Sequence, residues 1–161
     1  MVLDLTKTEK DFIDRTGKIS KQWGLGEPAG RVWASLLFTD SPLSQKEIAK
    51  KTGYSLSLVS PSLKILEKLN MIRSIRGEGR TKLYELAMSF IEAFNVIIKR
   101  FLENDVQPLI KQLENIKDIS KNSRLSKLTA EYKQLDKYLN WFEKMIFMKK
   151  ITGEKIKKLL G

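Results

Sequence analysis

The sequence of 161 residues contains neither cysteine nor histidine. The lack of cysteine excludes disulfides, thiolate nucleophiles and cysteine-based metal sites. The lack of histidine removes the usual general base, the Ser–His and Cys–His pairs and the commonest zinc ligand. Lysine and carboxylate catalysis stay open, but the sequence offers no recognisable site for either. An enzyme is therefore the least favoured class of function, and we expect no cofactor.

Long apolar runs are also missing. No stretch approaches the roughly 18–20 apolar residues of a membrane-spanning helix, and the chain does not open with a signal-peptide pattern. Hydrophobic residues make up 42% of the chain and charged residues 30%, which suits a packed core and argues against disorder. We expect a soluble cytoplasmic protein without a membrane partner.

Positive charge is unevenly distributed along the chain, whose formal net charge is +11. Residues 1–40 carry six basic and six acidic side chains, and residues 41–86 carry nine and four. Residues 87–161 carry fifteen and nine. The middle block is the shortest of the basic ones and has the most turn signals. A basic surface indicates a polyanionic partner such as nucleic acid, or it serves solubility alone.

The first forty residues predict two helices. Thr6 and Glu9 have the spacing of a capping box, so the first helix begins at Thr6. Residues 24–26, Gly-Leu-Gly, end it. Pro28 fits the first turn of the second helix, where its missing N–H loses no bond, and this helix ends near residues 40–42. The apolar positions of the two helices are Phe12, Ile13, Ile19 and Trp23, then Val32, Trp33, Leu36 and Leu37.

A third, short helix has the clearest start in the chain. Ser44 and Glu47 form a second capping box, and Leu43 and Ile48 are placed for a hydrophobic staple. Gly53 predicts a left-handed residue at its end.

A fourth helix follows Tyr54-Ser55 and closes at Leu69-Asn70, with Asn70 as a left-handed cap. At 100° per residue its apolar and polar residues separate onto opposite faces. Pro61 predicts a bend in the first turn or a helical start near Ser57. The apolar face holds Val59, Leu63 and Leu66, and the polar face holds Ser57, Ser60, Pro61, Lys64 and Lys68.

The periodicity then changes to that of strands. Residues 71–76 and 81–86 are short runs with β-branched and aromatic side chains. Between them, Gly77-Glu78-Gly79-Arg80 offers two residues that tolerate positive φ. The pattern predicts a β-hairpin with a basic tip.

From Ala87 onward the sequence is helical. Pro108 predicts a kink or restart, residues 117–124 a loop, and Thr152-Gly153 a break before a short basic helix, Glu154–Leu160. Two apolar stripes precede the loop: Phe90, Phe94, Ile97 and Phe101, then Leu109, Leu113 and Ile116. After it, seven apolar residues step by 3 and 4, which suits an antiparallel hairpin or helices of a second chain. These heptad positions are Leu125, Leu128, Tyr132, Leu135, Leu139, Phe142 and Ile146.

The order of helix, helix, tight turn, helix and basic hairpin predicts a winged helix-turn-helix, mainly α with a small β-hairpin wing. Small serine hydroxyls would let the fourth helix enter a major groove, and the hairpin would place Arg80 near a minor groove. Each feature also has a plain structural reading, as a cap or a solvated face. The predicted DNA contacts are Gln45, Lys46, Ser55, Ser57, Ser60, Lys64, Lys68, Arg73, Arg76, Arg80 and Lys82.

Residues 43–49, followed by Val59-Ser60 and residues 63–72, resemble the MarR superfamily of transcription regulators. Glu78-Gly79-Arg80 resembles the acidic-x-Arg motif of their wing. Residues 28–32, ahead of Leu36-Leu37, resemble the GbsR-type branch, often found in archaea and bacilli. The resemblance covers residues 5–110 well and the last fifty by pattern only.

This resemblance implies a homodimer joined through helices from both chain ends. The branch also suggests choline-like effectors, for which a cation–π cage of Trp23, Trp33 and Trp141 would be needed, although these side chains read first as apolar anchors. The expected dimerisation residues are Phe12, Ile19, Leu128, Tyr132, Leu135, Leu139, Phe142 and Ile146.

The leading hypothesis is a homodimeric, sequence-specific double-stranded DNA-binding transcription regulator, a repressor acting on a pseudo-palindromic operator. Residues 1–30 would contribute to dimerisation, residues 31–86 would bind DNA, and residues 87–161 would form the helical dimerisation region. The alternative is a winged-helix protein–protein adaptor of the transcription machinery without an operator of its own.

Overall fold

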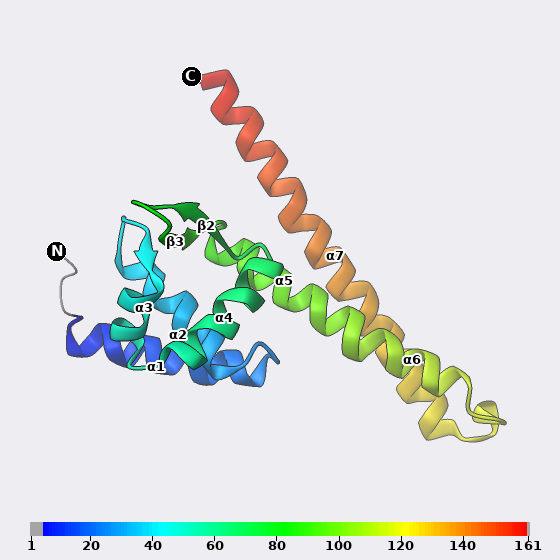
Figure 1. Cartoon of the computed structure of the whole chain (residues 1–161). Coiled ribbons are helices and arrows are strands. Elements are labelled where there is room, and N and C mark those ends of the chain that lie inside the picture. The colour runs from blue at the N-terminus through cyan, green and yellow to red at the C-terminus, as the bar shows by residue number, and fades with distance from the viewer. Residues whose placement is uncertain (1–4, 161) are drawn as a thin grey trace. The chain divides into compact units, whose positions relative to one another are not determined.

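The computed structural model describes the backbone of residues 5–160 and the side chains of residues 5–148. The chain divides into two compact units, Met1–Ser89 and Phe90–Gly161, which we describe separately (Figure 1). The first unit holds α1 (Lys7–Gln22), α2 (Glu27–Ser35), the 3-10 turn η1 (Leu36–Phe38), β1 (Leu43–Ser44), α3 (Gln45–Thr52), α4 (Leu56–Lys68), β2 (Ile72–Arg76) and β3 (Lys82–Leu86). The second unit holds α5 (Phe90–Phe101), the π-helix η2 (Leu102–Val106), α6 (Gln107–Glu114), the 3-10 turn η3 (Ile119–Lys121) and α7 (Ser123–Leu160).

The helix boundaries of the first unit follow its local caps. Thr6 caps α1 in a capping box with Glu9, and Pro28 lies in the first turn of α2. Hydrogen bonds from the Thr6 hydroxyl and N–H lower the pKa of Glu9. Gly53 and Asn70 take the left-handed conformation after α3 and α4. These predicted boundaries are therefore confirmed.

The first unit has one core, formed by α1 to α4 and one face of the sheet. Ile13 is the buried apolar residue of α1, whereas Phe12 and Ile19 of the predicted stripe are exposed, as is Leu37 after α2. Phe12 packs edge-on against Phe38. The core side chains are Ile13, Ala29, Val32, Trp33, Ala34, Leu36, Leu43, Ile48, Val59, Leu63, Leu66, Met71, Ile72 and Tyr84.

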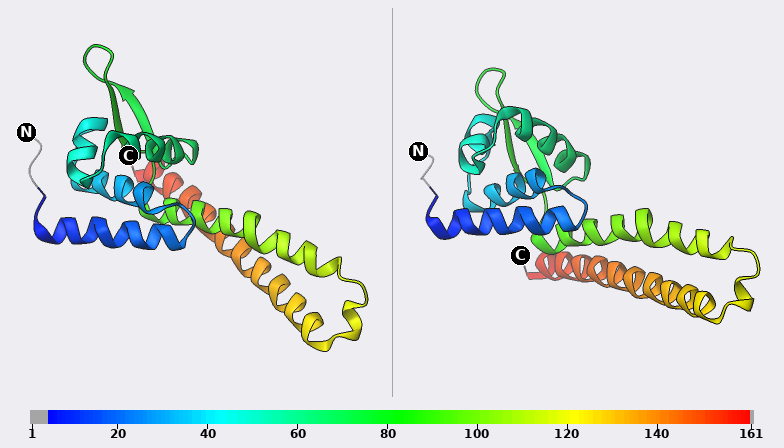
Figure 2. Two further views of the ribbon diagram at one scale, coloured as in Figure 1. Left: turned by 60° about the horizontal axis from the view of Figure 1, so that its bottom comes forward. Right: turned by 90° about the horizontal axis from the view of Figure 1, so that it is seen from below.

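The sheet is antiparallel with strand order β1-β3-β2. Arg73 of β2 pairs with Glu85 of β3, and Leu43 of β1 pairs with Tyr84. In Figure 2 the β2–β3 hairpin projects beyond the helices of its unit. The mainly α fold with a small β wing is confirmed, and the structure adds the two-residue strand β1, which the sequence pattern did not predict.

The second unit is a helical arm in which α7 runs antiparallel to α5 and α6 (Figures 1 and 2). Phe94 of α5 meets Phe142 of α7 edge-on, with ring centroids 6.3 Å apart. Of the heptad positions, Leu128 is exposed and the others are half-buried. The α7 heptads therefore pack against α5 and α6 of their own chain. Of the two arrangements that suited the sequence, an antiparallel hairpin or helices of a second chain, these contacts form the hairpin.

Two predictions for the second unit were wrong. Gly153 does not break α7, which continues to Leu160, because a single glycine costs a helix only about 1 kcal/mol. Phe90 and Ile116, at the ends of the two predicted stripes, are exposed. Phe101 and Leu109 are exposed as well, and Leu102 and Val106 are buried in their place. The reason for that exchange is η2: its wider turn adds a residue to the repeat and moves the inward face by one position.

None of the helices in the described part of the chain is both long and apolar enough to cross a membrane.

Candidate nucleic-acid interface

The start of α3 is fixed by a complete capping box. The Ser44 N–H and hydroxyl each donate to Glu47 Oε2 at 2.7 Å, and the Glu47 N–H donates to Ser44 Oγ at 3.3 Å. The Ser44 hydroxyl and backbone hydrogen bonds lower the pKa of Glu47 below its ordinary value. The carboxylate is thus ionised at neutral pH and stabilises the helix N-terminus.

Next along the chain, α4 buries one face and presents the other to solvent. Val59, Leu63 and Leu66 are buried, as predicted. On the opposite side Ser57, Pro61, Lys64 and Lys68 are exposed, and Ser60 is half-buried. The helix begins at Leu56, with Ser55 as N-cap, so Pro61 lies one turn inside it. Ser55 Oγ makes no capping bond and lies 2.7 Å from Ser57 Oγ.

Two side chains connect the preceding elements to α4 or to the turn just before it. Gln45 Nε2 of α3 donates to the backbone oxygen of Leu56 at 3.3 Å. Gln45, predicted as a DNA contact, thus has a structural bond to the first turn of α4.

Arg31 of α2 makes the second connection. Its guanidinium lies 2.8 Å from Asp14 Oδ1 of α1, donates to Thr52 O at 3.4 Å and stacks over the Tyr54 ring at 5.0 Å. Burial raises the pKa of the Tyr54 phenol, against the opposing effect of the Arg31 cation. One side chain therefore connects α1 to the turn between α3 and α4, a role that no local sequence signal identifies.

Hydrogen bonds between β2 and β3, and others within the connecting loop, hold the two strands of the wing in register. Gly77 N–H donates to Thr81 O at 2.8 Å, and Gly79 takes a positive φ of 65°. Arg76 Nε donates to Gly79 O at 3.5 Å. Arg73 Nε lies 2.6 Å from Glu85 Oε1 across the strands, so part of its donor capacity is used within the protein.

Five predicted contact residues remain as available cations. Each is exposed and makes no hydrogen bond or ion pair through its side chain with the residues that the structure describes. They are Lys46 of α3, Lys64 and Lys68 of α4, Arg80 of the wing loop and Lys82 of β3. The eleven predicted DNA contacts all belong to the first unit, as do Phe12 and Ile19, whereas the other predicted dimerisation residues belong to the second.

Sequence reasoning missed three exposed apolar residues of α4: Leu56, Leu58 and Ile65. At 100° per residue Leu58 and Ile65 fall outside the buried stripe, so the signal for these two was present. Leu56 falls within about 20° of Leu63 and is exposed at the first position of the helix. They lie beside the serines and lysines just described.

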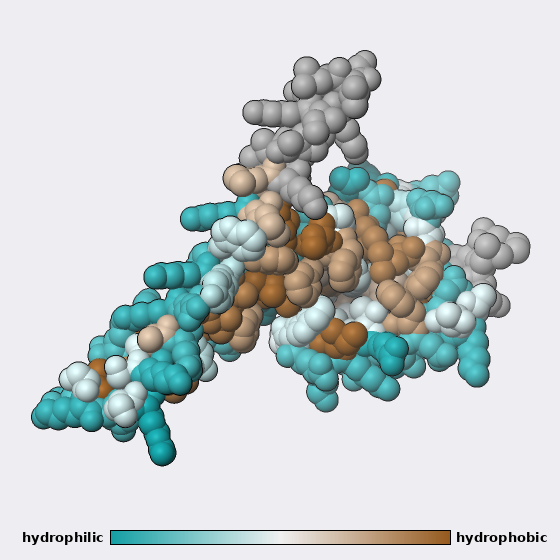
Figure 3. Space-filling view, turned by 180° about the vertical axis from the view of Figure 1, so that it is seen from behind, coloured by the Kyte–Doolittle hydropathy of each residue, from teal (hydrophilic) through white to brown (hydrophobic). Residues whose placement is uncertain are grey.

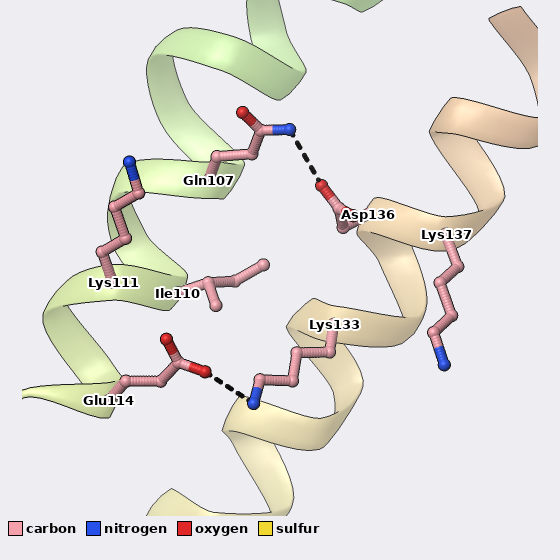
Figure 4. A pocket seen from close by; sticks show the side chains of 7 residues that line it. All are labelled: Gln107, Ile110, Lys111, Glu114, Lys133, Asp136 and Lys137. Carbon is pink, nitrogen blue, oxygen red and sulfur yellow. Dashed lines mark hydrogen bonds and ion pairs between the residues drawn. The ribbon is translucent and has the colours of Figure 1, made fainter.

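The arm offers a different kind of surface. Figure 4 shows an open pocket of about 390 Å³ between α6 and α7. Four of its side chains pair across it: Lys133 Nζ lies 2.6 Å from Glu114 Oε1, and Gln107 Nε2 donates to Asp136 Oδ1 at 3.2 Å. Lys111 and Lys137 line it as well. The two pairs join α6 to α7, so the pocket is explained by the packing of the arm.

The described residues give little support to a metal site or to a tryptophan cage for a cationic ligand. Among the described residues no group of carboxylates could hold a metal ion. Trp33 is buried in the core of the first unit, and Trp23 and Trp141 are exposed.

Comparison with known proteins identifies the fold. No protein-family model and no curated protein matches the chain. A solved structure described as a transcriptional regulator has a TM-score of 0.58 and 16% identity, over 93% of this chain and 99% of that chain. A possible transcriptional regulator from Methanosarcina mazei Go1 has a TM-score of 0.51 and 18% identity, over 62% of this chain and 86% of that chain. The chain therefore shares the winged-helix fold of these two structures.

Proposed function

We propose that this chain is a homodimeric, sequence-specific regulator of transcription that binds double-stranded DNA, works in the cytoplasm and acts as a repressor. The observation that carries the proposal is the exposed basic surface of the first unit. There α4 presents serines and lysines beside a projecting wing that ends in Arg80. A helix of this kind fits a major groove, and cations around it fit phosphates.

The fold also supports a regulator of transcription. The two solved structures compared above are described as transcriptional regulators, one of them as a possible one. The sequence resemblance to the MarR superfamily and its GbsR-type branch points to the same activity. We assign the direct contacts to Lys46, Ser55, Ser57, Ser60, Lys64, Lys68, Arg76, Arg80 and Lys82, with Gln45 and Arg73 in mainly structural roles.

Exposed apolar residues of α7 support the proposed dimer. Between residues 138 and 148, α7 carries eight apolar residues, whereas Asn140, Glu143 and Lys144 fall within about 100° of one another on one side. A helix with so wide an apolar surface is normally buried over much of its circumference. Figure 3 shows that the end of the arm around the α6–α7 turn is hydrophilic and that hydrophobic surface increases away from that turn. We name the exposed residues of this stretch the exposed α7 cluster: Tyr138, Trp141, Met145, Phe147 and Met148.

We propose that a second copy of the chain covers the exposed α7 cluster. We also keep the half-buried heptad positions of α7, which contact their own chain on one side, and the exposed Phe12 and Ile19 of α1 as proposed dimerisation residues. Two copies would hold their α4 helices about 34–36 Å apart, the spacing of half-sites on one face of a duplex. A small-molecule effector, choline-like by the GbsR resemblance, would act by changing that spacing.

Selection of bound fragments from a random duplex library, with the purified full chain, tests the proposed function. We expect enrichment of one inverted repeat with half-site centres about 10 base pairs apart, or a multiple of that. A library without enrichment would instead favour the protein–protein adaptor and would overturn the proposal.

Replacing Arg80 by alanine is expected to weaken binding of the selected duplex about ten- to hundredfold, because each subunit loses a charge-assisted contact. Binding measured over a range of salt should show a slope shallower by about 2 for the dimer. Arg124→Ala, at the exposed start of α7, removes the same charge elsewhere and serves as the control. Equal behaviour of the two variants would contradict the wing contact.

A further inference from the structure

The first turn of α4 exposes two leucines on either side of Ser57. Leu56 is 45% exposed and Leu58 is 43% exposed. Along the same helix Ile65 is also exposed, and it falls within about 20° of Leu58 at 100° per residue. Leu56 and Leu58 fall about 160° apart, so they flank the polar face that we propose for DNA on its two sides.

These leucines are not needed by the core. The buried side of α4 is complete with Val59, Ser62, Leu63 and Leu66. Leu58 lies outside that stripe, and Leu56 lies at its edge as the first residue of the helix. Exposing either side chain to water has a cost that a partner would remove. Their position in the first turn matters, because the N-terminal residues of a recognition helix are the ones that reach base edges.

The composition of α4 restricts what the helix can read. Leu56–Lys68 contains no arginine, asparagine or glutamine, the residues best suited to bidentate contacts with guanine or adenine, although Lys64 and Lys68 are present. Serine hydroxyls bond to several bases alike. The one apolar group on a base edge in the major groove is the 5-methyl group of thymine, which alkyl side chains contact.

The surrounding charge favours a polyanion as the occupant of this face. The first turn of α4 has no acidic residue. Lys64 and Lys68 on α4 and Lys46 on α3 are exposed and lack ion-pair partners among the described residues. A protein partner with an ordinary apolar surface would have to bury these charges, whereas phosphates would neutralise them.

We propose that Leu56 and Leu58 contact thymine methyl groups in the major groove, so that the operator half-sites carry A·T pairs beneath the first turn of α4. This inference depends on the proposed function. It assigns sequence preference to apolar contact at α4 and leaves the wing and the lysines to bind the backbone.

The test replaces thymine by deoxyuridine in the half-sites of the selected duplex, which removes the methyl group and keeps every hydrogen-bonding group. We expect affinity to fall about fourfold for each contacted methyl, with an unchanged salt slope. Leu56→Ala and Leu58→Ala should each reduce this discrimination between thymine and uracil. Leu37→Ala, at another exposed leucine of the same unit, should keep it in full.

The outcomes separate the inference from the proposed function. Tight binding of a selected duplex without any effect of uracil would overturn the inference and leave the function intact. Leucine variants that discriminate as well as the unaltered protein, or that change its mass in solution, would place the leucines in another contact and overturn it too. Failure to bind any duplex would overturn both.

Discussion

Glutamate in place of Trp141 is expected to leave the protein folded but monomeric. Trp141 is 63% exposed and lies in the exposed α7 cluster, so the substitution removes no core contact of its own chain. In a dimer it would place a charge in an apolar interface, which is strongly unfavourable. Light scattering should then give about 18.6 kDa, whereas we expect twice that mass for the unaltered protein.

The loss of the dimer should also lower DNA affinity. Two linked half-site contacts gain about 10²–10⁴ over one through effective concentration, and a monomer forfeits that gain. Ser126→Glu adds the same charge at an exposed position near the start of α7 and should change neither mass nor affinity.

Leu139→Lys provides the contrast within the same helix. Leu139 is a half-buried heptad position, so a lysine there should destabilise the arm itself. Circular dichroism would separate this loss of structure from the clean dissociation of the Trp141 variant. A Trp141→Glu protein that stays dimeric would show that the exposed α7 cluster does not join two copies.

Gly30→Ala is expected to produce the largest loss of stability from a single methyl group. Gly30 of α2 lies against Ser20 of α1, where an added Cβ would overlap the serine side chain and meet Thr16 O at 3.0 Å. Because the obstacles include backbone, α1 and α2 must separate. We expect about 1–3 kcal/mol of destabilisation, read as a drop in Tm of about 4–8 °C per kcal/mol for a unit of this size.

A double-mutant cycle checks the cause. Ser20→Gly removes the side chain that the new Cβ would strike, although it costs about 0.5 kcal/mol of helix propensity. Combined with Gly30→Ala, it should recover part of the lost stability, and the two changes should be clearly non-additive. Additive losses would mean that the α1–α2 contact is looser than the structure indicates.

The sequence was most informative where structure is decided locally. Capping boxes, the left-handed Gly53 and Asn70, and the apolar spacing of Val59, Leu63 and Leu66 depend on neighbours within a few residues, and all were predicted correctly. The wing followed from a Gly-rich loop between two short runs.

Features that depend on distant residues were not predictable in this way. The strand β1 exists because Leu43 and Ser44 pair with β3, some forty residues later in the chain. Arg31 joins Asp14, Thr52 and Tyr54, and nothing near Arg31 in the sequence indicates those partners. The candidate DNA contacts could be placed on α3, α4 and the wing, but the bonds that occupy Gln45 and Arg73 could not.

The π-helix η2 makes the arm sensitive to chain length at one place. Its extra residue turns everything that follows by about 100° relative to an ordinary α-helix. That rotation is what aims Val106 inward and presents Gln107 to Asp136. Deleting a single residue between 102 and 106 would restore regular pitch and swing α6 out of alignment with α7, whereas the same deletion in the loop around η3 would leave that alignment untouched.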